Sequence, residues 1–133
     1  MTVPYDWTRG EIAVVGLGRS GVSATMLLRR LGAQVYASDA GTTPAGTDAS
    51  LRAIGASVQS GAHDLARVAG AALVVTSPGV PPDAEALVAA RTAGVPIISE
   101  VELALAAMPG LRYVAITGTN GKSTVTAIVA HLL

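Results

Sequence analysis

Residues 12–39 read IAVVGLGRSGVSATMLLRRLGAQVYASD, which is the pattern of a strand, a glycine turn, a helix and a second strand. The run Ile12-Ala13-Val14-Val15 is short and apolar, as expected of a strand buried on both faces of a parallel sheet. From Ser20 the apolar residues follow helical spacing, and Gly32 can supply the left-handed residue after the helix. Residues 34–37 then have the composition of a strand. Strand, helix and strand in this order predict a right-handed crossover between parallel strands.

The same junction of helix end, glycine and strand start occurs three times along the chain. It is found in Leu31-Gly32-Ala33-Gln34-Val35, Ile54-Gly55-Ala56-Ser57-Val58 and Ala93-Gly94-Val95-Pro96-Ile97. Residues 71–75 form a further buried-strand pattern, and residues 83–93 form a helical one with Asp83 as a possible N-cap. We therefore predict an α/β fold, a Rossmann-like doubly wound parallel sheet.

The pattern changes near residue 110. Ser99 and Glu102 have the spacing of a capping box, which predicts a short helix ending near Met108. Pro109-Gly110 would end that helix, and residues 111–117 have the pattern of a new strand. We expect a domain boundary at this point.

Composition and charge limit the classes of function. Half of the 133 residues are hydrophobic and 14% are charged, which provides enough apolar material for a folded core. Nine basic and nine acidic side chains cancel, so neither a nucleic-acid binder nor a membrane-surface binder is expected. The absence of cysteine excludes disulfides and thiolate metal sites. Acidic residues near the N-terminus argue against a signal peptide, and no apolar run is long enough to span a bilayer, so we expect a cytoplasmic protein.

The first glycine motif, Gly16-Leu17-Gly18-Arg19-Ser20-Gly21, matches G-x-G-x-x-G between a predicted strand and a predicted helix. In this setting Gly16 permits a tight turn, Gly18 lets backbone amides approach a phosphate, and Gly21 lets helix and strand pack closely. Asp39 ends the next predicted strand, where dinucleotide-binding folds hold a ribose hydroxyl. The pattern predicts a nucleotide site. The alternative is a turn without a ligand, with Asp39 capping its strand.

The second motif is Gly118-Thr119-Asn120-Gly121-Lys122-Ser123-Thr124, again between a predicted strand and a predicted helix. The loop is shorter than the general P-loop, because Ile116 stands where that pattern has its first glycine. Its amides can still surround phosphate oxygens, while Lys122 supplies a compact cation and Ser123 can ligate Mg²⁺. Lys122 is the only lysine of the chain, which favours a specific role over general surface charge. An exposed turn with an incidental lysine is the alternative.

Three phrases together resemble the Mur ligases, the ATP-dependent amide-forming enzymes of bacterial peptidoglycan precursor synthesis. The phrases are Ala115-Ile116-Thr117-Gly118-Thr119-Asn120-Gly121-Lys122-Ser123, Gly16-Leu17-Gly18-Arg19-Ser20-Gly21 and Ser77-Pro78-Gly79-Val80-Pro81. The first resembles the family's ATP signature with its shortened loop, and alone it would also fit folylpolyglutamate synthases. The two upstream phrases narrow the resemblance to ligases that add D-glutamate to UDP-N-acetylmuramoyl-L-alanine. Without the resemblance, residues 77–82 would be interpreted as a plain turn.

The resemblance implies two parts. Residues 1–110 would form the Rossmann-like domain that holds the UDP part of the substrate, and residues 111–133 would provide the first strand, P-loop and helix of a truncated ATP-binding domain. For the UDP part it implies Gly16, Gly18, Arg19, Ser20, Gly21, Asp39 beside the uracil, and Gly79. For ATP it implies Gly118, Thr119, Asn120, Gly121, Lys122, Ser123 and Thr124, with Lys122 as the catalytic cation and Ser123 as the metal ligand. Ala40 and Gly41 follow Asp39, so side-chain contacts to uracil made by relatives would be missing.

By resemblance, the reaction has two steps. ATP with Mg²⁺ phosphorylates the carboxylate of UDP-N-acetylmuramoyl-L-alanine, and the amine of D-glutamate then attacks the acyl phosphate to form an amide. Further metal ligands of the family would lie beyond Leu133, so we expect the 133-residue chain to be inactive alone. A related ligase that adds L-alanine stays open as an alternative. So does a regulatory NAD-type Rossmann module, although such a module has no use for the second phosphate loop.

Two histidines receive no role from the sequence. His63 and His131 have neither each other nor a carboxylate at metal-ligand spacing, so we interpret both as structural or solvent-facing.

Overall fold

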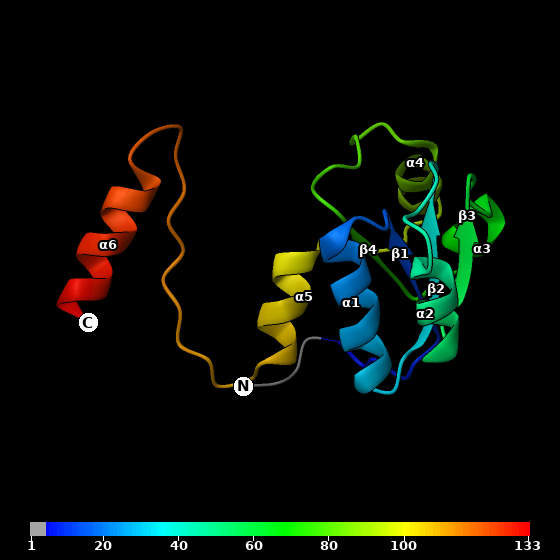
Figure 1. The fold of residues 1–133 in the computed structure, drawn as a ribbon, viewed down its shortest axis with the longest axis horizontal. Coiled ribbons are helices and arrows are strands. Elements are labelled where there is room, and N and C mark those ends of the chain that lie inside the picture. The colour runs from blue at the N-terminus through cyan, green and yellow to red at the C-terminus, as the bar shows by residue number, and fades with distance from the viewer. Residues whose placement is uncertain (1–4) are drawn as a thin grey trace.

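The computed structural model describes residues 5–133, and its centre is a parallel sheet of five strands (Figure 1). The strands are β1 (Glu11–Val15), β2 (Gln34–Asp39), β3 (Ser57–Ser60), β4 (Leu73–Thr76) and β5 (Ile97–Ser99), in the order β3-β2-β1-β4-β5. In the register, Ile12 of β1 pairs with Val35 of β2 on one side and with Leu73 of β4 on the other. The predicted doubly wound α/β fold is confirmed, and the strand order reverses between β1 and β4.

Helices cover both faces of the sheet. They are α1 (Arg19–Arg30), α2 (Thr47–Ala53), α3 (Leu65–Ala69), α4 (Glu85–Thr92) and α5 (Glu100–Ala107), with α6 (Lys122–Leu132) after them. Ile12 and Val14 of β1 pack in one core cluster with residues of α1, α2 and α5. Ala13 and Val15 belong to a second cluster with residues of α3 and α4. Because successive strand residues face opposite sides, β1 is buried on both faces, as its apolar run predicts.

The N-termini of two helices differ in how well the sequence predicts them. The capping box of α5 is confirmed: Ser99 Oγ accepts from the Glu102 backbone N–H at 3.2 Å, and Glu102 Oε2 accepts from the Ser99 N–H at 2.7 Å. The prediction of Asp83 as the N-cap of α4 is wrong, since Ala84 holds that position. The Ala84 N–H donates to the Pro81 carbonyl at 3.0 Å, so Asp83 lies inside this turn, before the helix begins.

The predicted strand over residues 111–117 does not form. That segment has no strand partner and is exposed except for the half-buried Ile116. The helix after it is present as α6 but buries no residue. Figure 1 shows α6 and its connecting segment extending away from the sheet. A strand needs backbone partners, and residues 5–133 offer this segment none.

Across the described part of the chain, none of the helices combines the length with the apolar character that crossing a bilayer would demand.

Candidate functional site

A cavity of about 520 Å³ opens at the carboxyl edge of the sheet. It lies among the loops that follow β1, β2, β3 and β4, which are brought together because parallel strands all end at one edge. Its lining consists of Gly16, Gly18, Ser20, Asp39, Ala40, His63, Ser77, Pro78, Gly79, Val80, Pro81 and Ala84. The reversal of strand order between β1 and β4 places the cavity at the usual ligand position of doubly wound sheets.

The three glycines of the first motif differ in what the structure requires of them. Gly16 has φ +96°, and an added Cβ would lie 2.8 Å from Val80 Cγ2. A Cβ at Gly21 would lie 1.9 Å from the Gly16 carbonyl oxygen, so no side chain fits there. Gly18 has φ −67° and no heavy atom within 4 Å of an added Cβ. Gly16 and Gly21 therefore build the turn, as predicted, while Gly18 leaves the N-terminus of α1 open to the cavity.

Asp39 links the loops after β1 and β2. Its Oδ2 accepts from the Leu17 N–H at 2.6 Å, and its Oδ1 accepts from the Gly41 N–H at 2.8 Å. These bonds hold the glycine turn against the end of β2. The carboxylate also borders the cavity, so it organises the loop and remains available to a ligand through its further lone pairs.

Arg19 lies beside the cavity rather than in it. It borders a neighbouring hollow of about 570 Å³, together with Gly18, Asp39, Thr42 and Pro44. Gly18 and Asp39 line both hollows, so the two lie next to each other at the start of α1. Five of the seven residues predicted for the UDP part line the first cavity, namely Gly16, Gly18, Ser20, Asp39 and Gly79; Arg19 borders the second, and Gly21 is packed behind the turn.

The segment Ser77–Pro82 closes the cavity from the side of β4. Ser77 Oγ lies 3.2 Å from the Gly16 carbonyl oxygen and 2.5 Å from Glu100 Oε1. The hydroxyl thus connects the turn after β1, the turn after β4 and the start of α5. Gly79 has no heavy atom within 4 Å of an added Cβ, so its backbone faces open space in the cavity. This segment is more than a plain turn, because it forms one wall of the site.

His63 is a lining residue that sequence reasoning missed. Its Nδ1 lies 2.8 Å from Ser38 Oγ, and Ser38 is fully buried at the end of β2. Burial lowers the pKa of His63, although the nearby carboxylates of Asp39 and Glu85 act in the opposite direction. His63 has no histidine or carboxylate at metal-ligand spacing, so the sequence around it does not indicate a functional role. Its position after a predicted strand of a parallel sheet is the one indication that it reaches the ligand edge.

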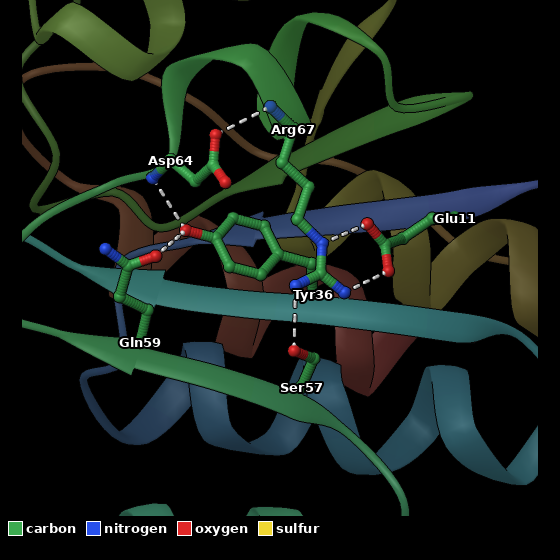
Figure 2. A network of polar contacts seen from close by, with 6 residues as sticks. All are labelled: Glu11, Tyr36, Ser57, Gln59, Asp64 and Arg67. Carbon is green, nitrogen blue, oxygen red and sulfur yellow. Dashed lines mark hydrogen bonds and ion pairs between the residues drawn. The ribbon is translucent and has the colours of Figure 1, made fainter.

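A polar network beneath α3 fixes the loop that carries His63 (Figure 2). The Tyr36 hydroxyl donates to Gln59 Oε1 and accepts from the Asp64 N–H, both at 2.8 Å. Arg67 donates to both carboxylate oxygens of Glu11 at 2.6 Å, and its guanidinium lies 4.5 Å from the centroid of the Tyr36 ring. The hydrogen bond from Arg67 to Glu11 raises the pKa of Arg67. The network joins β1, β2, β3 and α3, and it extends from Asp64, the residue after His63, to Glu11 at the start of β1.

The second glycine loop is exposed throughout. Gly121 is the N-cap of α6 with φ +76°, Gly118 has φ +152°, and both conformations favour glycine. No heavy atom lies within 4 Å of an added Cβ at Gly121. Lys122 and Ser123 begin the helix as predicted. The glycine conformations and the start of the helix thus agree with the predicted loop, whereas the strand predicted before it does not form.

The strand order and the glycine-lined cavity at its reversal define a Rossmann-like class of α/β domain. The chain belongs to the Mur ligase family, since residues 10–99 match the family model described as Mur ligase MurD-like, N-terminal domain. No three His, Asp or Glu side chains gather as a metal site within residues 5–133.

Similar proteins agree with this assignment. The chain is 44% identical over its whole length to a UDP-N-acetylmuramoylalanine–D-glutamate ligase of Frankia casuarinae, covering 28% of that protein. It is 49% identical over 92% of its length to the same ligase of Anaeromyxobacter dehalogenans, covering 27% of it. Among solved structures, UDP-N-acetylmuramate-alanine ligase MurC of Thermotoga maritima matches with a TM-score of 0.63 and 31% identity, over 93% of this chain and 29% of that one. The chain thus spans little more than a quarter of these relatives.

Proposed function

We propose that the chain is the N-terminal part of an ATP-dependent ligase that adds D-glutamate to UDP-N-acetylmuramoyl-L-alanine. Residues 1–110 would bind the UDP part of the substrate, and residues 111–133 would begin the ATP-binding domain. The proposal includes a cytoplasmic location, which agrees with the cysteine-free composition.

The observation that carries the proposal is the cavity at the reversal of strand order. Gly18 and Gly79 both line it with open space where a side chain would be, and the first turn of α1 has no side-chain cap. Uncapped amides and the positive end of a helix dipole stabilise an anion, by about 0.3–1 kcal/mol when exposed. A diphosphate suits this arrangement, and the relatives named above act on a UDP-linked substrate by their names.

The second loop would serve the ATP phosphates. Backbone amides between Gly118 and Lys122 would surround them, the Lys122 ammonium would neutralise charge, and the Ser123 hydroxyl would ligate Mg²⁺. ATP with Mg²⁺ would supply the phosphoryl group that activates the substrate carboxylate. Thr119, Asn120 and Thr124 complete this loop in the proposal.

Calorimetric titration of the 133-residue chain with UDP-N-acetylmuramoyl-L-alanine, UDP and NAD tests the first part. We expect both uridine ligands to bind and NAD to give no heat. Trp7 is a poor reporter for this test, because it is 8% exposed and precedes β1, at the opposite end of that strand from the cavity. Tight NAD binding without a response to uridine ligands would contradict the proposal.

A coupled ADP-release assay tests the second part. With UDP-N-acetylmuramoyl-L-alanine, D-glutamate and Mg·ATP, we expect no turnover from the 133-residue chain and turnover from a protein that continues it to the relatives' length. Replacing D-glutamate by L-alanine in the longer protein separates the two ligases. Turnover with L-alanine alone would overturn the D-glutamate assignment while leaving the family intact.

A further inference from the structure

We propose that His63 is a ligand-binding residue of this cavity, which donates a hydrogen bond from Nε2 to the diphosphate of a bound uridine diphosphate sugar. This inference rests on the proposed function. Among the residues that line the cavity, His63 is the one side chain that can carry a positive charge, since Arg19 borders the neighbouring hollow. The lining also includes Asp39, so the cavity otherwise has a negative side chain and no cation to meet a diphosphate.

The contact with Ser38 fixes the tautomer of the imidazole. Ser38 is fully buried, and His63 Nδ1 is the hydrogen-bond partner of its hydroxyl in the described structure. A buried hydroxyl proton needs an acceptor, so Ser38 donates to Nδ1 while the ring is neutral; in the protonated ring Nδ1–H donates to Ser38 Oγ instead. In the neutral ring the proton then resides on Nε2, and no hydrogen bond within residues 5–133 uses that atom. The ring therefore offers a donor even when it is uncharged.

Hydrogen bonds of the next residue, Asp64, hold the loop that carries His63 in place. Asp64 donates its N–H to the Tyr36 hydroxyl at 2.8 Å and caps α3 by accepting from the Arg67 N–H at 3.0 Å. The Tyr36 ring lies under the Arg67 guanidinium in the network of Figure 2. A donor on a fixed loop loses little conformational entropy when a ligand binds.

Ligand binding should be coupled to protonation of the His63 imidazole. Burial lowers the pKa of His63, while Asp39 at the end of β2 and Glu85 in the first turn of α4 oppose this effect. A bound diphosphate diester adds two negative charges and raises the pKa of His63 in the complex. The complex then holds more protons than the free chain, so affinity increases as the pH falls from about 8 to about 5.5.

The test is calorimetric titration with UDP-N-acetylglucosamine, because its two phosphates are both diesters and keep their charge over this pH range. His63→Gln places an amide donor near the position of Nε2, whereas His63→Asn places one near Nδ1. His63→Ala removes both. His131→Gln is the matched control, since His131 is exposed on α6. The unfolding of each variant, followed by Trp7 fluorescence, shows whether it folds.

We expect wild type and His131→Gln to bind more tightly at the lower pH. His63→Ala and His63→Asn should bind about 3- to 10-fold more weakly at pH about 8, as expected for one lost hydrogen bond. His63→Gln should recover most of that affinity, and none of the His63 variants should keep the pH dependence. A purely structural role predicts the opposite order, with Asn better than Gln.

Two results would overturn the assignment in distinguishable ways. If the wild-type chain bound neither UDP-N-acetylglucosamine nor UDP-N-acetylmuramoyl-L-alanine, the proposed function and the role of His63 would fail together. If wild type bound and folded His63→Ala matched it at both pH values, the role of His63 alone would be wrong.

Discussion

At the scale of single residues, glycine has two different physical roles in the turn after β1. Gly21→Ala would place a methyl carbon 1.9 Å from the Gly16 carbonyl oxygen, which is backbone and cannot rotate away. Helix α1 must then move off β1, at a cost we expect to exceed about 3 kcal/mol in the free energy of unfolding. Urea denaturation followed by Trp7 fluorescence measures this loss, and a stable Gly21→Ala variant would show that the turn can open.

Gly18→Ala is the matched substitution without the steric conflict. Gly18 has φ −67°, and its added Cβ meets no atom within 4 Å. We expect the free energy of unfolding to change by less than about 1 kcal/mol, because Ala tolerates this conformation. Under the proposed function, the methyl group would lie where the diphosphate approaches, so calorimetry should show a large loss of UDP affinity. Unchanged affinity would place the diphosphate elsewhere.

Asp39 should matter for stability as well as binding, because both of its oxygens accept backbone N–H groups. Asp39→Asn keeps one acceptor and turns an NH₂ group toward either Leu17 or Gly41. The amide left without an acceptor should cost about 1–3 kcal/mol in the free energy of unfolding. Denaturation with and without UDP separates this loss from any change in ligand contacts. A variant as stable as wild type would mean that water replaces the lost acceptor.

The lowered pKa of His63 should also make the free energy of unfolding depend on pH. Burial lowers its pKa in the folded chain below the value of 6.5 for an unperturbed histidine. The unfolded chain therefore binds more protons below about pH 6.5, and the contribution of His63 to stability is lost as the pH falls from there through its folded pKa. His63→Gln lacks this titration, so the wild type should lose more stability than the variant on acidification. Parallel pH curves in urea denaturation would contradict the shift.

At the scale of secondary-structure elements, the Arg67 side chain connects α3 to the first residues of β1 and β3. Arg67 donates to both oxygens of Glu11 at 2.6 Å and to Ser57 Oγ at 2.9 Å. Arg67→Lys keeps the charge but loses the two-pronged geometry, and we expect a loss of about 1–2 kcal/mol in the free energy of unfolding. The rate of backbone amide hydrogen exchange in α3 should rise as the free energy of unfolding falls.

Arg52→Lys is the control for this prediction. Arg52 lies 3.9 Å from Asp48 and donates to the Val58 carbonyl at 2.9 Å; its side chain is 56% exposed, and such surface pairs contribute about 0–1 kcal/mol. We expect its effect to stay within about 0.5 kcal/mol. Equal losses in the two variants would mean that the network of Figure 2 adds nothing beyond general surface charge.

The elements also show which parts of the fold are local properties of the sequence. The strand β1 and the capping box at Ser99 follow from side chains a few residues apart, and both are confirmed. The strand predicted over residues 111–117 has an equally good local pattern, yet it does not form, because no strand within residues 5–133 pairs with it. Asp83 fails as an N-cap because the turn after Pro81 competes for the same residues.

At the scale of the whole molecule, the cavity is a product of topology. Gly16, Asp39, His63 and Gly79 come from loops after four different strands, and only the parallel order β3-β2-β1-β4 brings them to one edge. The glycine motif could be predicted because it is contiguous. His63 could not, because its partner Ser38 lies 25 positions away and the pair exists only after β2 and β3 have paired.

Residues 111–133 should contribute little to the stability of the sheet domain. Helix α6 buries no residue, and its apolar side chains Ile128 and Leu132 are 55% and 77% exposed. Hydrophobic stabilisation requires burial, so deleting residues 111–133 should change the free energy of unfolding of the sheet domain by less than about 1 kcal/mol. Denaturation reported by Trp7, which lies in the core beside Tyr5, measures the sheet domain selectively. A loss above about 2 kcal/mol would show that α6 packs onto this domain in solution and buries its apolar side chains there.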